Sequence, residues 1–299
     1  MENYNVAIVG QGPAGLSAAI YTARAGMSTI ILGCAPKVAG NYTIDNYFGF
    51  PEPITGDKLI DLGKKQAEKF GTTLRCEKVL AIHFTEKASF RIKTDTGEYQ
   101  ARAVILATGV SRVRPGIKNL SEYEGRGVSY CVSCDGFFCR DKKVMVVGEG
   151  IFAANQALEL KEYTPHVKIY TQLKKPTITP AFETRLKKAD IPVVEKKIKS
   201  LEGDHILERV LFQDGTSEDV DGLFVAMGEA SSLDFAYSLG LSRNGVFIEA
   251  DQQQKTNIPG VFAAGDCVGR FLQISVAAGE GAIAGKEAIE YIKGLDDSD

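Results

Sequence analysis

The stretch NVAIVGQGPAGLSAAIYTARAG, residues 5–26, runs from an apolar strand through a glycine-rich turn into a helical pattern. Its turn, GQGPAG, has the G-x-G-x-x-G spacing of a dinucleotide-binding fold. Gly10 allows the tight turn, Gly12 lets the backbone approach a pyrophosphate, and Gly15 lets the helix pack closely on the strand. In this context the motif predicts an α/β domain that binds a dinucleotide.

The first helix begins at Pro13 and Ala14. Proline suits this position, since an N–H in the first helical turn has no partner within the helix. The helix N-terminus then faces the anion of the ligand.

This layout occurs twice. KVMVVGEGIFAANQALEL, residues 143–160, repeats the strand, glycine turn and helix, and a further apolar strand follows each copy at 28–33 and 167–172. Residues 79–107 alternate apolar and polar side chains around turns, which predicts an antiparallel excursion that returns to a buried strand. The sequence therefore predicts an α/β protein with two Rossmann-like folds of the three-layer ββα FAD/NAD(P)-binding type, one inserted in the other.

The expected domain division follows from that insertion. A discontinuous first domain holds both chain ends, residues 1–113 and 245–299, and the second glycine turn lies in an inserted domain, residues 114–244.

Composition sets limits on function. The chain has 299 residues, 44% of them hydrophobic, a formal charge of −3 and a pI of about 5.8, which favours neither a nucleic-acid partner nor a membrane surface. No apolar run approaches the roughly 20 residues of a membrane span. The N-terminus lacks the basic flank and cleavage site of a secretory signal, so we expect a cytoplasmic protein.

Two of the six cysteines, Cys131 and Cys134, form a C-x-x-C pair within SYCVSCDGFF. A structural zinc site needs four cysteine or histidine ligands, and none of the three histidines lies near this pair, so no metal is expected. A structural disulfide is disfavoured in the cytoplasm. A redox-active dithiol is the better interpretation. We expect Cys34 and Cys139 to be packing residues.

Three separated elements, GQGPAG, ILATG and GVFAAGDC, together resemble the FAD-binding fingerprints of two-dinucleotide-fold flavoprotein reductases. The resemblance implies FAD as the cofactor, with Thr108 and Gly109 along it. It also implies that Asp266, after Gly265 in the GD element, holds the ribityl chain. One departure is that the second strand ends without the acid that commonly binds the ribose, so that contact has no assigned residue.

With its CVSCDG motif, the chain from residue 5 to residue 294 resembles the low-molecular-weight bacterial thioredoxin reductases. The resemblance implies a homodimer with thioredoxin as substrate, and rotation of the inserted domain. It also makes Asn41 and Asn46 candidates for flavin contact. LQISVAAG resembles the helix start that contacts the isoalloxazine ring, at Gln273 and Ile274, although Leu272 replaces the usual arginine of the family.

Asp135, next to Cys134, is placed to move a proton as a general acid or base, although it could also be a helix N-cap. By resemblance, Cys134 is the sulfur closer to the flavin. Which thiol attacks the substrate stays open.

The second glycine turn, GEGIFA, departs from NADPH-dependent members. Glu149 places a carboxylate where a diphosphate would lie, and Phe152 a bulky ring. The next strand leads into YTQLKKPTITPAF, which has none of the arginines that grip the 2′-phosphate of NADPH, although Lys174 and Lys175 could act as point charges. The chain thus resembles the ferredoxin-dependent flavin thioredoxin reductases of clostridia.

That resemblance implies ferredoxin as electron donor. Residues 161–199 carry ten basic and four acidic side chains, a local charge of +6, which could be a solvated face or could attract an acidic ferredoxin. Two alternatives stay open. One is an NADPH-dependent thioredoxin reductase with an unusual cofactor clamp, or a relative that serves a peroxidase. The other is a non-catalytic flavoprotein that senses redox state through its thiol pair.

Overall fold

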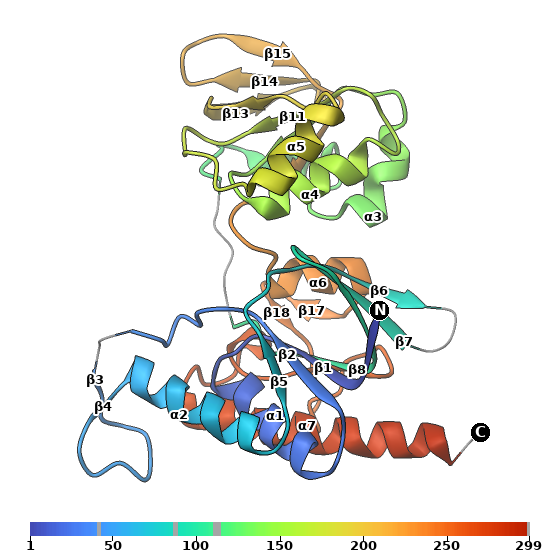
Figure 1. The fold of residues 1–299 in the computed structure, drawn as a ribbon. Helices are drawn as coiled ribbons and strands as arrows, with labels where there is room; N and C mark the ends of the chain where they lie inside the picture. Colours follow the sequence, from blue (N-terminus) through green and yellow to red (C-terminus); the bar gives the residue numbers. More distant parts are fainter. Residues whose placement is uncertain (41–42, 86–88, 110–114, 298–299) are drawn as a thin grey trace. The chain divides into compact units, whose positions relative to one another are not determined.

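The computed structural model describes residues 1–40, 43–85, 89–109 and 115–297, and its chain forms two compact units. The first unit comprises Met1–Ser111 and Ser231–Asp299, and the second comprises Arg112–Ala230 (Figure 1). Residues 231–244, expected in the inserted domain, therefore group with the first unit. The expected division between 113 and 114 lies outside the described residues.

The first unit is built on a seven-stranded sheet in the order β5-β2-β1-β8-β7-β6, with β19 paired to β8. The parallel strands are β1 (Glu2–Val9), β2 (Thr29–Leu32), β5 (Thr73–Arg75), β8 (Glu98–Leu106) and β19 (Val261–Ala263). The strands β6 (Val79–Thr85) and β7 (Ser89–Thr94) are antiparallel to their neighbours, as the alternating pattern predicts.

Helices α1 (Pro13–Arg24), α2 (Gly56–Lys69) and α7 (Ile274–Asp296) lie together on one side of this sheet (Figure 1). The core between them joins apolar residues of β1, β2, β8 and β19 to small residues of α1 and α7, such as Ala18 and Ala284. Small side chains let the two helices approach each other closely.

Short elements complete the first unit. They are β3 (Thr43–Ile44), β4 (Ile54–Thr55), α6 (Ser232–Leu239), β17 (Arg243–Asn244), β18 (Phe247–Ile248) and the 3-10 helix η3 (Asp266–Val268). Helix α6 packs against β6 and β18, which is why residues 231–244 belong to this unit.

The second unit has a parallel five-stranded sheet in the order β12-β11-β10-β16-β9 and a three-stranded antiparallel sheet, β13-β14-β15. The strands are β9 (Val128–Ser129), β10 (Val144–Val147), β11 (Val167–Tyr170), β12 (Val193–Val194), β13 (Ile198–Glu202), β14 (Arg209–Phe212), β15 (Ser217–Asp219) and β16 (Gly222–Val225). The helices are η1 (Leu120–Tyr123), α3 (Val132–Asp135), η2 (Gly136–Cys139), α4 (Ile151–Leu160) and α5 (Pro180–Lys188).

The predicted fold class is confirmed: β1-α1-β2 and β10-α4-β11 each place a helix between two paired parallel strands, as in a Rossmann fold. No helix in the described ranges is long and apolar enough to cross a membrane.

Candidate functional site

Four segments of the first unit meet at one edge of its sheet. The glycine turn follows β1, Gly33 follows β2, Thr108 lies just beyond β8, and Gly265 lies just beyond β19. Because these strands are parallel neighbours, their carboxyl ends share one edge, where open α/β sheets bind their ligands.

The first glycine turn is compact at two glycines and open at the third. A Cβ atom on Gly10 would lie 2.2 Å from the carbonyl oxygen of Ala107, and one on Gly15 would lie 1.9 Å from that of Gly10. A Cβ atom on Gly12, by contrast, would meet only the Pro36 side chain, at 3.8 Å. The backbone at Gly12, the N-cap of α1, therefore has room beside it for a phosphate group.

The polar atoms at this edge fit a cofactor. The Oγ1 atom of Thr108 is buried and has no hydrogen-bond partner among the described residues. A buried hydroxyl without a partner is costly, so a ligand that hydrogen-bonds it is favoured. The carboxylate of Asp266, half-buried at the start of η3, is likewise unpaired within the described chain. Gly109 has a φ of +67° and open space beside it.

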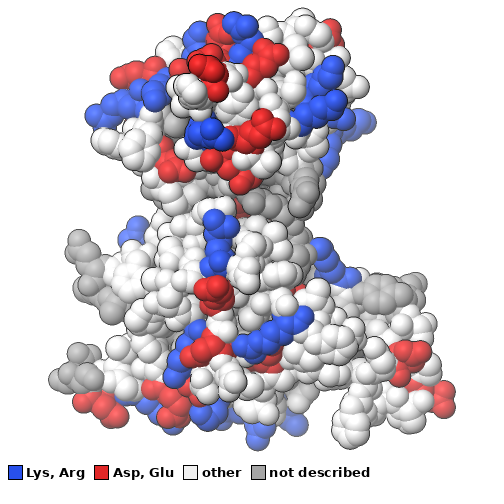
Figure 2. Space-filling model, turned by 180° about the vertical axis from the view of Figure 1, so that it is seen from behind, with Lys and Arg blue, Asp and Glu red and all other residues white. Residues whose placement is uncertain are grey.

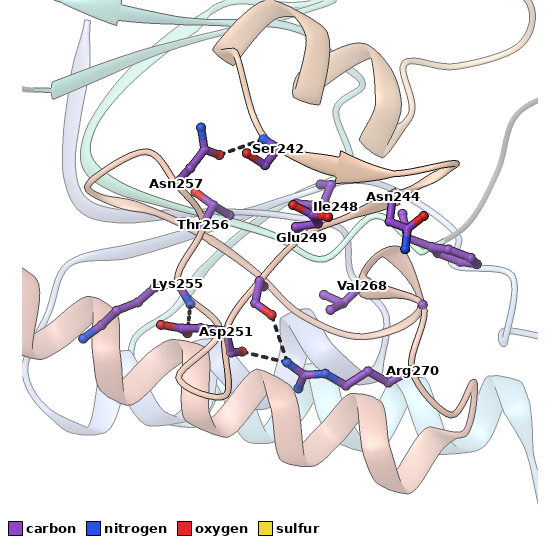
Figure 3. A pocket seen from close by; sticks show the side chains of 13 residues that line it. Ser242, Asn244, Ile248, Glu249, Asp251, Lys255, Thr256, Asn257, Val268 and Arg270 are labelled. Carbon is purple, nitrogen blue, oxygen red and sulfur yellow. Dashed lines mark hydrogen bonds between the residues drawn. The ribbon is translucent and has the colours of Figure 1, made fainter.

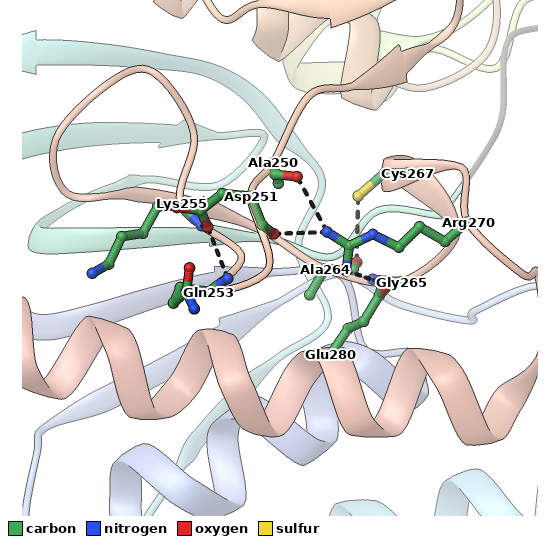
Figure 4. A network of polar contacts seen from close by, with 9 residues as sticks. All are labelled: Ala250, Asp251, Gln253, Lys255, Ala264, Gly265, Cys267, Arg270 and Glu280. Atoms are coloured by element: carbon green, nitrogen blue, oxygen red, sulfur yellow. Dashed lines mark hydrogen bonds and ion pairs between the residues drawn. The ribbon is translucent and has the colours of Figure 1, made fainter.

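The GD element is held in place by a buried carboxylate of the last helix. Glu280 of α7 accepts a hydrogen bond from the backbone N–H of Gly265 at 2.7 Å and pairs with Arg270 at 3.1 Å. Arg270 also donates to the carbonyl oxygens of Ala250 and Asp251 (Figure 4). This network fixes the loop that carries Asp266.

Two predicted flavin contacts lie against each other. The Nδ2 atom of Asn46 donates to Oε1 of Gln273 at 3.1 Å, although the residues are 227 positions apart. Gln273 is the N-cap of α7 and Ile274 its first residue. Asn41 lies outside the described residues.

A pocket of about 620 Å³ borders the same loop on another side (Figure 3). It is lined by ten residues between Ser242 and Asn257, in and around the strand pair β17-β18, and by Val268, Gly269 and Arg270. None of the predicted cofactor or thiol residues lines it.

The thiol pair lies in the second unit, where Cys131 and Cys134 form a disulfide with sulfurs 2.07 Å apart. Cys131 is buried and is the N-cap of α3, and Cys134 is exposed. The backbone N–H of Cys134 donates to the Cys131 sulfur at 3.2 Å. This hydrogen bond favours negative charge on Cys131 once the disulfide opens.

Asp135 is held beside the pair by Ser129. The hydroxyl of Ser129 donates to Oδ2 of Asp135 at 2.5 Å and accepts from the backbone N–H of Cys131 at 3.1 Å. Asp135 occupies the N-cap position of η2, but its side chain makes no capping hydrogen bond there. Cys139 is a buried free thiol, as predicted.

In the second glycine turn, Glu149 is tied to the chain segment that follows β11. Glu149 Oε1 pairs with Lys174 Nζ at 2.5 Å, and the backbone N–H of Thr177 donates to the Glu149 carbonyl at 2.7 Å. A Cβ atom on Gly150, the counterpart of the open Gly12, would meet Gly228 and Thr177 at 3.2 and 3.5 Å. The space beside Gly150 is therefore narrowed by the segments that follow β11 and β16. Phe152, expected to block the nucleotide, instead packs inward and is 4% exposed.

The prediction that Cys34 is only a packing residue is wrong. Cys34 forms a disulfide with Cys76, whose Cα atom lies 4.4 Å away although 42 positions separate the two residues. The cause is the parallel pairing of β2 with β5, which aligns Leu32 with Arg75 and so brings the two chain segments together beyond the strand ends. Local sequence patterns carry no signal of that register.

Comparison with known proteins agrees with this geometry. Residues 4–281 match the family described as pyridine nucleotide-disulphide oxidoreductase. The thioredoxin reductase of Peptoclostridium litorale is 35% identical over 315 residues, covering 99% of each chain.

The chain belongs to the thioredoxin reductase family.

Two solved structures of this family are similar to the chain. The atypical thioredoxin reductase TRi of Desulfovibrio vulgaris Hildenborough is 63% identical, with a TM-score of 0.95 over 97% of this chain and 98% of that one. A ferredoxin-flavin thioredoxin reductase of Clostridium acetobutylicum is 30% identical, with a TM-score of 0.74 over 98% and 99%. As a member of the thioredoxin reductase family, the chain is an FAD-dependent oxidoreductase that works through a disulfide.

Proposed function

We propose that this chain reduces the disulfide of thioredoxin through Cys131 and Cys134, with electrons from reduced ferredoxin. The observation that carries the donor assignment is the Glu149–Lys174 ion pair across the second glycine turn. Its carboxylate is 12% exposed and repels a phosphate, and the lysine that could have bound NADPH is already neutralised.

The loop that carries Lys174 is rigidly placed. Gln172 and Leu173 both have left-handed backbone angles, with φ of +57° and +60°. The buried side chain of Gln172 donates to the carbonyl of Pro115 at 2.8 Å and accepts from the N–H of Ile198 at 2.7 Å. Opening this loop to admit a dinucleotide would break buried hydrogen bonds, which supports a donor other than NADPH.

Ferredoxin is favoured by energy and by charge. Low-potential ferredoxins lie about 130 mV below thioredoxin, so a two-electron transfer is downhill by about 6 kcal/mol. On the face of the second unit that Figure 2 shows, basic and acidic side chains are interspersed. The last turn of α5 nevertheless presents Arg185, Lys187 and Lys188, all exposed and without an ion pair in the described part of the chain. We assign the docking of an acidic ferredoxin to this turn.

The residues proposed for FAD are those at the strand ends and the start of α7, together with Asn46 and the undescribed Asn41. They are Gly10, Gly12, Pro13, Ala14, Gly15, Asn41, Asn46, Thr108, Gly109, Gly265, Asp266, Gln273 and Ile274. FAD supplies the conversion of single electrons from a ferredoxin into a pair. The open turn at Gly12 and the unpaired Thr108 hydroxyl support this assignment.

The protein residues then act on the thiols. Two electrons open the Cys131–Cys134 bond, Asp135 moves the proton, and one thiolate attacks the disulfide of thioredoxin, forming a mixed disulfide that the other thiol resolves. Cys134 is the accessible sulfur and Cys131 the one stabilised as an anion by the N–H of Cys134. Resemblance to the family supports a cytoplasmic homodimer.

The donor assignment is tested by anaerobic reduction of the bound flavin. We expect reduced ferredoxin to bleach the flavin absorbance at least about 10³-fold faster than equimolar NADPH or NADH, a difference of about 4 kcal/mol in barrier. Rapid bleaching by NADPH at micromolar concentration would overturn the assignment.

A charge-reversed variant tests the docking turn in the same assay. Arg185→Glu/Lys187→Glu/Lys188→Glu should lower the ferredoxin rate by about tenfold at low salt and have less effect at high salt. The control is Lys286→Glu on α7, which adds an acid far from α5 in sequence and in the other unit. Equal losses in the two variants would contradict docking at α5.

The proton-transfer role is tested by Asp135→Asn. We expect thioredoxin turnover to fall by about 10²-fold and its pH profile to lose one limb, since general acid–base catalysis is worth about 10²–10⁴-fold. The control is Asp141→Asn, an exposed residue of the same unit whose φ of +58° asparagine tolerates well. A pH profile unchanged in Asp135→Asn would show that the carboxylate only holds Ser129.

A further inference from the structure

The Cys34–Cys76 disulfide has no part in the reaction proposed above, yet it lies at the cofactor edge of the first unit. It joins the chain just beyond β2 to the chain just beyond β5. Cys76 is exposed and Cys34 half-buried. An exposed disulfide can be reached by a protein thiol, whereas a buried structural one cannot.

Both joined segments are hydrogen-bonded to the first glycine turn or to each other. The N–H of Gly10 donates to the carbonyl of Leu32 at 2.7 Å, and that of Gly33 donates to the carbonyl of Arg75 at 3.2 Å. The side chain of Gln11, 4% exposed, donates to the same Arg75 carbonyl at 2.9 Å. The disulfide therefore cross-links two segments that are hydrogen-bonded to each other and to the proposed phosphate-binding turn.

The bond also closes a long loop. The residues between the two cysteines include α2 and the segment that carries Asn46, which contacts Gln273. A Cβ atom on Gly56, at the start of α2, would lie 1.9 Å from the Val38 carbonyl, so the chain after Cys34 packs directly on that helix. Opening a cross-link at the ends of such a loop increases its local unfolding.

We propose that Cys34–Cys76 is a second thiol–disulfide exchange site, which a reduced small dithiol protein of the thioredoxin kind opens, and that opening it weakens retention of FAD. The identity of this partner rests on the proposed function, since such a protein is its product. In the cytoplasm proposed above, surviving disulfides are typically those that exchange.

The chemistry balances without another reactant. A thiolate of the partner attacks the exposed Cys76 sulfur, forming a mixed disulfide and releasing Cys34 as a thiolate that takes up a proton. The second thiol of the partner then attacks the mixed disulfide and releases Cys76. In sum, Cys34–Cys76 gains two electrons and two protons, and the partner dithiol becomes a disulfide.

The first test isolates this exchange from the catalytic pair. The FAD-loaded Cys131→Ser/Cys134→Ser variant is incubated anaerobically with chemically reduced thioredoxin, and thiols are alkylated and mapped by mass spectrometry. We expect Cys34 and Cys76 to gain label together while the buried Cys139 and Cys267 do not. A pair that stays oxidised, that opens only with dithiothreitol, or that is already reduced in enzyme purified in air would overturn the proposal.

The second test measures FAD release by fluorescence of the filtrate. We expect the same variant to release FAD about tenfold faster once Cys34–Cys76 is reduced, equivalent to about 1.4 kcal/mol, and to return to the slow rate after reoxidation with diamide. Cys34→Ser/Cys76→Ser in the wild-type background should release FAD at the fast rate in either condition. Equal rates for oxidised and reduced protein would refute the link to FAD.

Neither readout requires a ferredoxin or thioredoxin turnover. Failure of the donor assay therefore leaves these tests intact, and failure of these tests leaves the proposed reaction intact.

Discussion

Replacing Cys134 with serine is expected to abolish thioredoxin reduction, by at least about 10³-fold, while the bound FAD remains at full occupancy. The Cys131–Cys134 bond is the only disulfide described in the second unit, so without it that unit has no two-electron carrier. The residues proposed for FAD lie in the other unit, which is why FAD content should not change. Turnover is measured with dithionite-reduced enzyme, so that the result does not depend on the natural donor.

The matched control for this substitution is Cys139→Ser. Cys139 is a buried free thiol only five positions from Cys134, and burial raises its pKa above the ordinary value, so it is a poor nucleophile at neutral pH. We expect its turnover to stay within about twofold of wild type. If Cys134→Ser kept a tenth or more of the activity, electrons would have to leave the enzyme by another route.

The glycine turns could be predicted from the sequence because their requirements are local. Gly10 adopts a φ of +114°, and a Cβ atom on Gly15 would lie 1.9 Å from the carbonyl oxygen of Gly10, so both demands fall on residues within one short stretch. The helix that follows is specified equally locally, by Pro13 at its first position. The fold class could be predicted because this strand, glycine turn and helix occur twice in the chain.

Contacts between distant segments could not be predicted in the same way. The Cys34–Cys76 bond depends on the register of β2 against β5, and the Glu149–Lys174 pair depends on two consecutive left-handed residues after β11. Nothing in the periodicity of either segment encodes these features. The sequence predicted that Glu149 and Phe152 would both disturb a nucleotide at the second glycine turn, but the ring of Phe152 packs in the core of its unit.

The packing of α7 on α1 is a long-range contact that a single substitution tests. A Cβ atom on Gly281 would lie 2.0 Å from the carbonyl oxygen of Ala14, a backbone atom that cannot move without shifting the start of α1. Gly281→Ala is therefore expected to lower the free energy of unfolding by about 2–3 kcal/mol. Because Ala14 belongs to the first glycine turn, the same variant should also purify with much less FAD.

Gly279→Ala is the matched control, two positions earlier on the same helix. A Cβ atom added there would have no other atom within 4 Å, and alanine is a better helix former than glycine, so stability should rise by about 0.5–1 kcal/mol. Urea unfolding with flavin fluorescence as the signal measures both effects. Unfolding of the two variants at the same urea concentration would show that the close approach of α7 to the glycine turn does not position the cofactor edge. The contrast separates that contact from the helix propensity that the two substitutions share.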